Sequence, residues 1–249
     1  MRAAHTRRML GAATVATVTL VGLTACFIPA PPPVPQAPNT DPVVPGTSGS
    51  ADVREGLIEA DGTTEIELDV ADRSAVVLGA VSTDGEDLMM RLSGGNADFE
   101  NDDGASELDG FAFEMRSRDP LIGAVLEPGS YTIELGEYNG DRTGFQLQVL
   151  TSSTVVGVGE SASLEVAPGA PALFIARVTT GQESIRAEAD FDSVLWGRSS
   201  ADASSLMDDD SGGDSNPLIT LDGTVDGDIV MVAAAYDRDE GGMVLVSVE

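Results

Sequence analysis

Short runs in which apolar and polar residues alternate strictly are the strongest constraint on how this 249-residue chain folds. The clearest are residues 65–70 (EIELDV), 130–135 (SYTIEL) and 145–149 (FQLQV). Successive side chains of a β-strand point to opposite faces of the sheet, so each run predicts a strand with one buried and one wet face. Asp-Gly, Gly-Gly, Asn-Gly and Pro-Gly turn signals separate the runs, and no stretch of 12 residues carries a helical stripe. The sequence therefore predicts an all-β protein.

The chain also repeats part of its own sequence. The run at 119–135 (DPLIGAVLEPGSYTIEL) resembles the run at 216–232 (NPLITLDGTVDGDIVMV), and 77–83 (VLGAVST) resembles 174–180 (FIARVTT). Both pairs are displaced by 97 positions. A unit of about 97 residues can bury a core of its own. We therefore expect two tandem β-sandwich domains of the jelly-roll type.

The first 25 residues have the features of an export signal. Residues 1–8 carry three arginines and no acid, and residues 9–25 are uncharged, apolar and small. This combination is typical of a signal peptide, because a membrane-spanning helix needs about 20 predominantly apolar residues. Arg7 and Arg8 leave both the general secretory route and the twin-arginine export route open.

The tetrapeptide Leu23-Thr24-Ala25-Cys26 resembles the lipobox of bacterial lipoproteins. The resemblance implies that Cys26, the only cysteine of the chain, is acylated through its sulfur and becomes the first residue after cleavage. An acyl chain contributes about 0.8 kcal/mol per buried methylene, and a stable anchor needs more than one chain. We therefore expect a lipid-anchored protein on the extracytoplasmic face of the cell membrane.

Four regions are expected along the chain. A signal peptide at 1–25 precedes a segment at 26–51 that holds the lipidated cysteine and a linker rich in proline, glycine and serine. Such a linker cannot bury enough apolar surface to order itself, so we expect disorder with polyproline II character. The first sandwich domain is expected at 52–152 and the second at 153–249.

Composition excludes most catalytic chemistry. Removal of residues 1–25 leaves no histidine and no lysine, because the only histidine is His5 and all 13 basic residues are arginine. With Cys26 lipidated, Ser-His-Asp triads, Cys-His pairs, lysine Schiff bases and His/Cys zinc sites are excluded, while carboxylate chemistry and oxygen-ligand metal sites remain. The 10 arginines and 42 acids after residue 25 give a net charge of −32, which excludes nucleic acid as a partner.

The first repeat carries a series of motifs that is similar to the series of a known domain family. In chain order these are 87–92 (DLMMRL), 101–104 (NDDG), 120–122 (PLI), 128–133 (PGSYTI) and 145–149 (FQLQV). The series resembles the bacterial pre-peptidase C-terminal domain, a β-sandwich found beside many secreted proteases. The resemblance implies a jelly-roll-like sandwich with a non-catalytic accessory role. Members of this family in collagen-degrading enzymes bind calcium and matrix protein.

The second repeat is a weaker copy of the same series. Residues 192–196 (DSVLW) and 208–210 (DDD) match the first two motifs. Asp226-Gly227-Asp228 stands where the Gly-x-Tyr strand should start, so the family's tyrosine is missing here.

Two predicted loops, one in each repeat, are crowded with carboxylates. The candidate metal ligands are Asp98, Glu100, Asp102 and Asp103 in the first repeat and Asp208, Asp209, Asp210 and Asp214 in the second. Calcium takes six to eight oxygen ligands, of which each loop could supply about three or four. Neither loop has the spacing of an EF-hand, because Asp103 stands where that loop needs its glycine. A calcium site and a solvated acidic turn both remain open for these loops.

A carboxylate pair could also hydrolyse a glycoside, although sugar grooves are lined by aromatic platforms. The chain has one tryptophan and three tyrosines, and the sequence pattern places Tyr131 and Trp196 in the core. We therefore expect a membrane-anchored, non-catalytic module that binds or scaffolds an envelope protein or glycan, with calcium as the one cofactor in question. The first alternative is a calcium-stabilised accessory module of a secreted enzyme or cell-wall component. The second, less favoured, is a carboxylate-dependent polysaccharide hydrolase.

Overall fold

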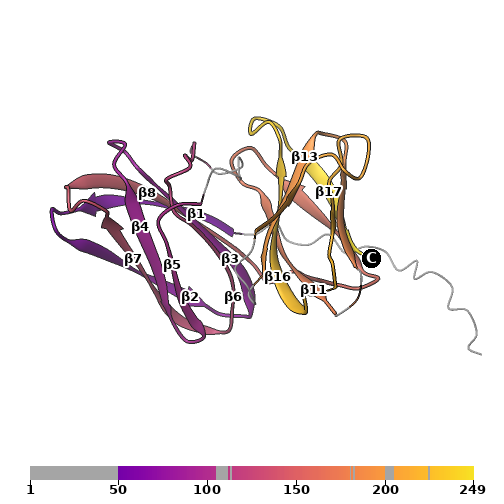
Figure 1. Cartoon of the computed structure of the whole chain (residues 1–249), viewed down its shortest axis with the longest axis horizontal. Coiled ribbons are helices and arrows are strands. Elements are labelled where there is room, and N and C mark those ends of the chain that lie inside the picture. Colours follow the sequence, from indigo (N-terminus) through magenta and orange to yellow (C-terminus); the bar gives the residue numbers. More distant parts are fainter. Residues whose placement is uncertain are drawn as a thin grey trace, which may run out of the picture. The chain divides into compact units, whose positions relative to one another are not determined.

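The computed structural model describes residues 50–104, 112, 114–179, 181, 183–199, 205–223 and 225–249. The predicted signal peptide, Cys26 and all but the end of the predicted linker lie outside these residues. Every element of the described chain is a β-strand, which confirms the all-β prediction (Figure 1). None of the described residues belongs to a helix long and apolar enough to span a bilayer.

Strands β1 to β8 form a sandwich of two antiparallel sheets, which we call sandwich 1. Sheet A has the order β1-β8-β3-β6 and sheet B the order β2-β7-β4-β5. The strands are β1 (Ser50–Ile58), β2 (Thr63–Val70), β3 (Ser74–Ser82), β4 (Leu88–Gly94), β5 (Ala97–Asn101), β6 (Leu121–Leu126), β7 (Gly129–Glu137) and β8 (Thr143–Ser152). The alternating runs predicted from the sequence lie in β2, β7 and β8, and their apolar residues form the core between the two sheets.

Strands β9 to β17 form sandwich 2. Sheet C has the order β14-β13-β16-β11-β9 and sheet D the order β10-β17-β12-β15. The strands are β9 (Val155–Gly157), β10 (Ser161–Val166), β11 (Ala172–Val178), β12 (Ser184–Ala189), β13 (Ser193–Ser199), β14 (Ser205–Asp208), β15 (Leu218–Thr220), β16 (Gly227–Ala235) and β17 (Gly242–Val248). All pairings are antiparallel except that of β9 with β11.

Sandwich 2 repeats the strand order of sandwich 1. When β10–β17 are set against β1–β8 in chain order, sheet D matches sheet A and sheet C matches sheet B, with β9 as an addition. The repeated run at 216–232 covers β15 and the first part of β16, and the run at 119–135 covers the equivalent β6 and most of β7. The strands of this part of the predicted repeat are confirmed, with a displacement of 97 positions between β6 and β15 and of 98 between β7 and β16.

The other predicted match, between 77–83 and 174–180, is wrong. The first run lies in β3, whereas the second lies in β11, which is the equivalent of β2 rather than of β3. The two strands look alike because both are buried on both faces and so consist of continuous apolar residues. Their similarity reflects shared burial and not a shared place in the fold.

A third apolar layer, which we call the junction, joins the two sandwiches. The side chains of β3 alternate between two layers, since Val76 and Leu78 face the core of sandwich 1 whereas Ala75 and Val77 face sandwich 2. The buried residues of the junction are Ala75, Val77, Val81, Met115, Leu121 and Leu150 from sandwich 1 with Leu173, Ile175, Trp196, Val230, Val232 and Ala234 from sandwich 2. Both sandwiches therefore belong to one compact unit.

Trp196 packs across the junction against a glycine of the other sandwich. A Cβ atom at Gly123 would lie 3.1 Å from Cη2 of Trp196, so the close approach depends on the missing side chain. Gln148 Nε2 donates a hydrogen bond to the Gly169 carbonyl oxygen across the same boundary, at 3.1 Å. The predicted burial of Trp196 is confirmed at 2% exposure, but its partners lie between the sandwiches and not inside one of them.

Substitution of a junction residue by a charge should separate the unfolding of the two sandwiches. We expect Val77→Asp to lower the free energy of unfolding by about 3 kcal/mol or more, because it buries an unpaired carboxylate. The melting temperature should fall by roughly 6–12 °C. Fluorescence of Trp196, the only tryptophan, should then change before the circular dichroism signal. Val53→Asp, at a 45% exposed position of the same sheet, is the control. Equal losses for the two variants would contradict the junction.

Candidate functional site

The four predicted ligands of the first repeat do not share one loop. Asp98 and Glu100 lie on strand β5, and only Asp102 and Asp103 follow in the bend after it, which corrects the sequence prediction. Asp98 Oδ1 accepts hydrogen bonds from Arg91 Nη2 at 2.8 Å and from Nε at 3.2 Å. This hydrogen bond and the charge of Asp98 raise the pKa of Arg91. Asp98 is therefore engaged in an exposed ion pair on the outer face of sheet B.

In the second repeat, one predicted ligand holds its loop together. Asp208 ends β14, and its Oδ2 accepts hydrogen bonds from the backbone N–H groups of Leu218 at 2.7 Å and Ser211 at 3.0 Å. Asp209, Asp210 and Asp214 lie in the acidic segment that follows. Among the eight predicted ligands, all of which the structure describes, no three have carboxylate oxygens within 4.8 Å of one another. Calcium binding by these loops stays a prediction.

A different acidic group does come together, at one end of sandwich 1. The carboxylates of Glu86, Glu137 and Asp141 offer ligand atoms that all lie within 4.8 Å of one another. Glu86 lies in the connection between β3 and β4, Glu137 ends β7, and Asp141 lies in the turn before β8. Sequence reasoning missed this group, which we call the acidic cluster.

Hydrogen bonds fix the two loops that carry the acidic cluster. Glu137 is only 5% exposed, and its Oε2 accepts hydrogen bonds from the backbone N–H groups of Asn139 at 2.8 Å and Asp141 at 2.6 Å. The Tyr138 N–H donates to the Asp87 carbonyl oxygen at 2.9 Å, which ties the two loops to each other. The Glu137 carboxylate and the backbones of the two loops are therefore held in place before any ion arrives.

Three like charges at this spacing repel one another, and a shared cation relieves the repulsion. Carboxylate oxygens are the ligands that calcium prefers, and a weak extracellular site needs only part of its shell from protein carboxylates. The acidic cluster thus has the chemistry of a hard-cation site.

A polar pocket beside sheet A contains a buried acid. A cavity of about 330 Å³ is lined by Ser82, Glu114, Arg116 and Asp119 among others. Asp119 is 5% exposed, and burial raises the pKa of its carboxyl group, opposed by a hydrogen bond that the Arg116 N–H donates to it. Asn216 takes the equivalent place before the Pro-Leu-Ile run of the second repeat. The fold therefore accepts a neutral side chain at this position.

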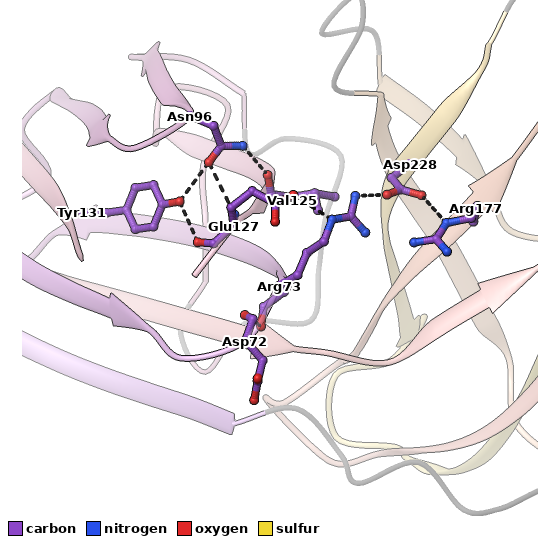
Figure 2. A network of polar contacts seen from close by, with 9 residues as sticks. Asp72, Arg73, Asn96, Val125, Glu127, Tyr131, Arg177 and Asp228 are labelled. Carbon is purple, nitrogen blue, oxygen red and sulfur yellow. Dashed lines mark hydrogen bonds and ion pairs between the residues drawn. The ribbon is translucent and has the colours of Figure 1, made fainter. Parts of the chain in front are cut away.

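A polar network crosses the boundary between the sandwiches at the edge of the junction (Figure 2). Arg73, between β2 and β3, donates from Nε to Glu127 Oε1 at 2.9 Å and forms an ion pair with Asp228 of β16. Arg177 of β11 donates from Nε to the other oxygen of Asp228 at 3.1 Å. The Asp228 side chain is 12% exposed, and it stands between two guanidinium groups that belong to different sandwiches.

The same network reaches into the core of sandwich 1. The Tyr131 hydroxyl shares its one proton between two acceptors, Asn96 Oδ1 at 2.8 Å and the Glu127 carbonyl oxygen at 2.7 Å (Figure 2). Tyr131 is 2% exposed, which confirms its predicted core position. Because Glu127 also contacts Arg73, the edge of the junction is anchored to buried groups on the sandwich 1 side.

No protein-family model matches the chain, and no curated protein matches it. Among solved structures, the chain is similar to the pre-peptidase C-terminal domain of collagenase from Bacillus anthracis, with 15% sequence identity and a TM-score of 0.31 over 45% of this chain and 99% of that one. It is similar to PBSX exported protein XepA, with 11% identity and a TM-score of 0.31 over 80% and 86%. It is also similar to latent PorU from Porphyromonas gingivalis, with 9% identity and a TM-score of 0.26 over 85% and 21%.

Asp119→Asn should stabilise the protein at neutral pH and not in acid. Burial raises the Asp119 pKa, so the folded state favours the neutral carboxyl group. The stability that Asp119 contributes is therefore fully present below the ordinary aspartate pKa, and it is lost as pH rises through the raised pKa. We expect a gain of up to about 1 kcal/mol at pH 7 and little change near pH 3. Urea unfolding at both pH values measures it, with the exposed Asp103→Asn as control. Equal effects at the two pH values would contradict the assignment.

Proposed function

We propose that the chain is a lipid-anchored, non-catalytic module on the extracytoplasmic face of the cell membrane, and that its two sandwiches act as one arm that binds or scaffolds an envelope protein or glycan. The anchor and the location are inferred from Cys26 and the residues before it, and the observation that supports a single arm is the junction. Domains of one chain move relative to each other unless the interface between them is large and hydrophobic. Here the facing surfaces of sheet A and sheet C are apolar and buried over several strands of each.

The placement of the tyrosines and the tryptophan shows which of them can contact a partner. The side chain of Tyr131 packs in the core of sandwich 1, and the side chain of Trp196 packs in the junction. Tyr138 and Tyr236 are 61% and 60% exposed, and each donates its backbone N–H to the residue before a strand of the same sandwich, Asp87 or Asp192. These two exposed rings occupy equivalent positions in the repeats and are available to a partner outside the chain.

The anchor is tested by removal of its thiol. We expect Cys26→Ala to release the protein from the membrane fraction into the soluble fraction, because no acyl chain can be attached. Immunoblots of fractionated cells measure the distribution, and circular dichroism checks that the strands persist. Thr24→Ser, which keeps the cysteine and a small residue before it, is the matched control and should stay bound. Membrane retention of the Cys26→Ala protein would overturn the anchor.

A second candidate function is that of a calcium-stabilised accessory module, and the acidic cluster is the observation that favours it. Glu86, Glu137 and Asp141 would hold the ion at the end of sandwich 1, where it would lock the β3–β4 and β7–β8 connections together. Calcium bound only by the folded state stabilises that state by mass action.

Calcium should therefore raise the melting temperature, and the acidic cluster should be required for the effect. With a dissociation constant of about 10⁻⁴–10⁻³ M, 10 mM calcium should raise the melting temperature by roughly 3–11 °C. We expect Glu86→Gln with Asp141→Asn to abolish the rise. Asp102→Asn with Asp103→Asn is the control and should keep it. Melts with calcium and with EDTA at matched ionic strength make the comparison. If calcium does not raise the melting temperature of the unaltered protein, this function is ruled out. If only the control variant loses the calcium-dependent rise, the site lies instead in the loop predicted from the sequence.

A further inference from the structure

Sheet D occupies in sandwich 2 the place that sheet A occupies in sandwich 1, but the outer faces of the two sheets differ in what covers them. The outer face of sheet A is buried in the junction over β3, β6 and β8, while Val53 and Leu57 of the edge strand β1 stay exposed. On the outer face of sheet D, Met243 is 52% exposed and Leu245 is 38% exposed, both on the inner strand β17. Within the part of the chain that the structure describes, nothing covers this apolar pair.

The apolar pair forms part of a groove of about 490 Å³. Ser163 of β10 faces Leu245 across one strand boundary, and Glu188 of β12 faces it across the other. The small serine leaves the space that the groove occupies, and Asp190 and Asp214 complete the wall on the β12 side. This volume lies in the range of sites that accept small ligands or a few side chains.

The groove carries an uncompensated negative charge. Of its three carboxylates, only Glu188 has a described cationic partner, Arg186, whose Nε lies 3.0 Å from Glu188 Oε1. Asp190 and Asp214 form no ion pair with any residue that the structure describes. Glu165, opposite Met243 in the register of β10 and β17, adds a further carboxylate beside the apolar pair.

The loop that brings Asp214 to the groove is held in a defined shape. Asn216 Oδ1 accepts a hydrogen bond from the Ala189 N–H at 2.9 Å, and its Nδ2 donates to the Asp214 carbonyl oxygen at 3.4 Å. Asp214 and Ser215 have φ values of 55° and 60°, a conformation that side chains other than glycine adopt at a cost and that the surroundings must hold. Asn216 supplies that restraint, so the acidic wall does not depend on a ligand for its position.

A second copy of this chain does not fit the groove. In the junction, sheet A packs against sheet C, which is the equivalent of sheet B. A second copy that packed on sheet D in the same way would therefore present its sheet B. The outer face of sheet B carries Glu65, Glu67 and Glu134. Two acidic faces repel each other, as would two sheet D faces. Charge complementarity instead favours a cationic occupant, and the exposed Met243 and Leu245 favour one that also carries an aliphatic group.

We propose that the groove on the outer face of sheet D binds an extended segment of a partner protein in which basic residues flank an aliphatic one. The aliphatic side chain would lie over Met243 and Leu245, and the basic side chains would reach Asp190 and Asp214. This inference deepens the proposed function, on which it rests, by assigning the binding surface and the chemistry of the partner. Binding at the groove can be measured whether or not Cys26 is acylated, so the two proposals fail separately.

The direct test is the binding of fluorescent pentapeptides to the full-length chain, measured by anisotropy with a detergent blank. We expect Arg-Leu-Arg-Leu-Arg to bind at least tenfold more tightly than Arg-Ser-Arg-Ser-Arg, which has the same charge without the aliphatic groups. Glu-Leu-Glu-Leu-Glu should not bind. Equal binding of the two basic peptides would mean general attraction to an acidic protein and would overturn the proposal. Displacement of the bound peptide by an equal concentration of spermidine would assign the groove to small polyamines and would also overturn it.

Variants locate the binding. Met243→Ser with Leu245→Ser should weaken binding of the Arg-Leu peptide about tenfold, while Asp190→Asn with Asp214→Asn should weaken it and reduce its dependence on salt. All four side chains are at the surface, so the fold should persist, and circular dichroism checks this. The matched control is Glu65→Gln with Glu67→Gln on sheet B, which should leave binding unchanged. A control that weakens binding as much as the groove variants would place the peptide elsewhere.

Discussion

The apolar layer between sheet A and sheet C is the interaction on which the rest of the molecule depends. Strands β3, β11 and β16 bury both of their faces, so each contributes to its own sandwich and to the junction at once. A sandwich without its neighbour would expose a contiguous apolar face, which soluble proteins rarely tolerate. The repeats therefore form one body, and sheet B, sheet D and the loops keep surfaces that are available to a partner.

The edge of the junction shows how the two repeats have diverged to fit each other. Ser130 and Asp69 are paired across strands in sandwich 1, where the serine hydroxyl donates to Asp69 Oδ1 at 2.7 Å. At the equivalent place in sandwich 2, Arg177 pairs with Asp228, and Arg73 from sandwich 1 adds a second guanidinium. A nearly buried carboxylate is costly unless it is paired, so Asp228 favours the docked arrangement over any other. The docking therefore uses Asp228, which stands where the first repeat has Ser130.

The strand content of the fold could be predicted from the sequence, whereas the docking could not. One-sided alternation in β2 and β7 identifies strands that face a core and water, and the structure places them so. In β8 the outward-facing Gln148 is only 1% exposed, because that face of the strand meets the other sandwich. The runs in β3 and β11 lack alternation because a second layer covers their outer faces, and that signal was available in the sequence as continuous apolar residues. Which run faces which is not encoded locally, because Val77 and Ile175 belong to different sandwiches and come together only in the junction.

The candidate metal site shows the same limit at the level of single residues. A run of acids draws attention, yet Asp98 lies on a strand and pairs with Arg91, and Asp208 holds its own loop. Glu137 stands at the next inward-facing position of β7 after Tyr131, Ile133 and Leu135. A carboxylate at such a position, which is otherwise apolar, was the sequence signal for a buried acid. Its companion Glu86 comes from a different loop, and only the fold brings the two together. In a chain this acidic, the density of carboxylates in the sequence does not show which of them the fold brings together.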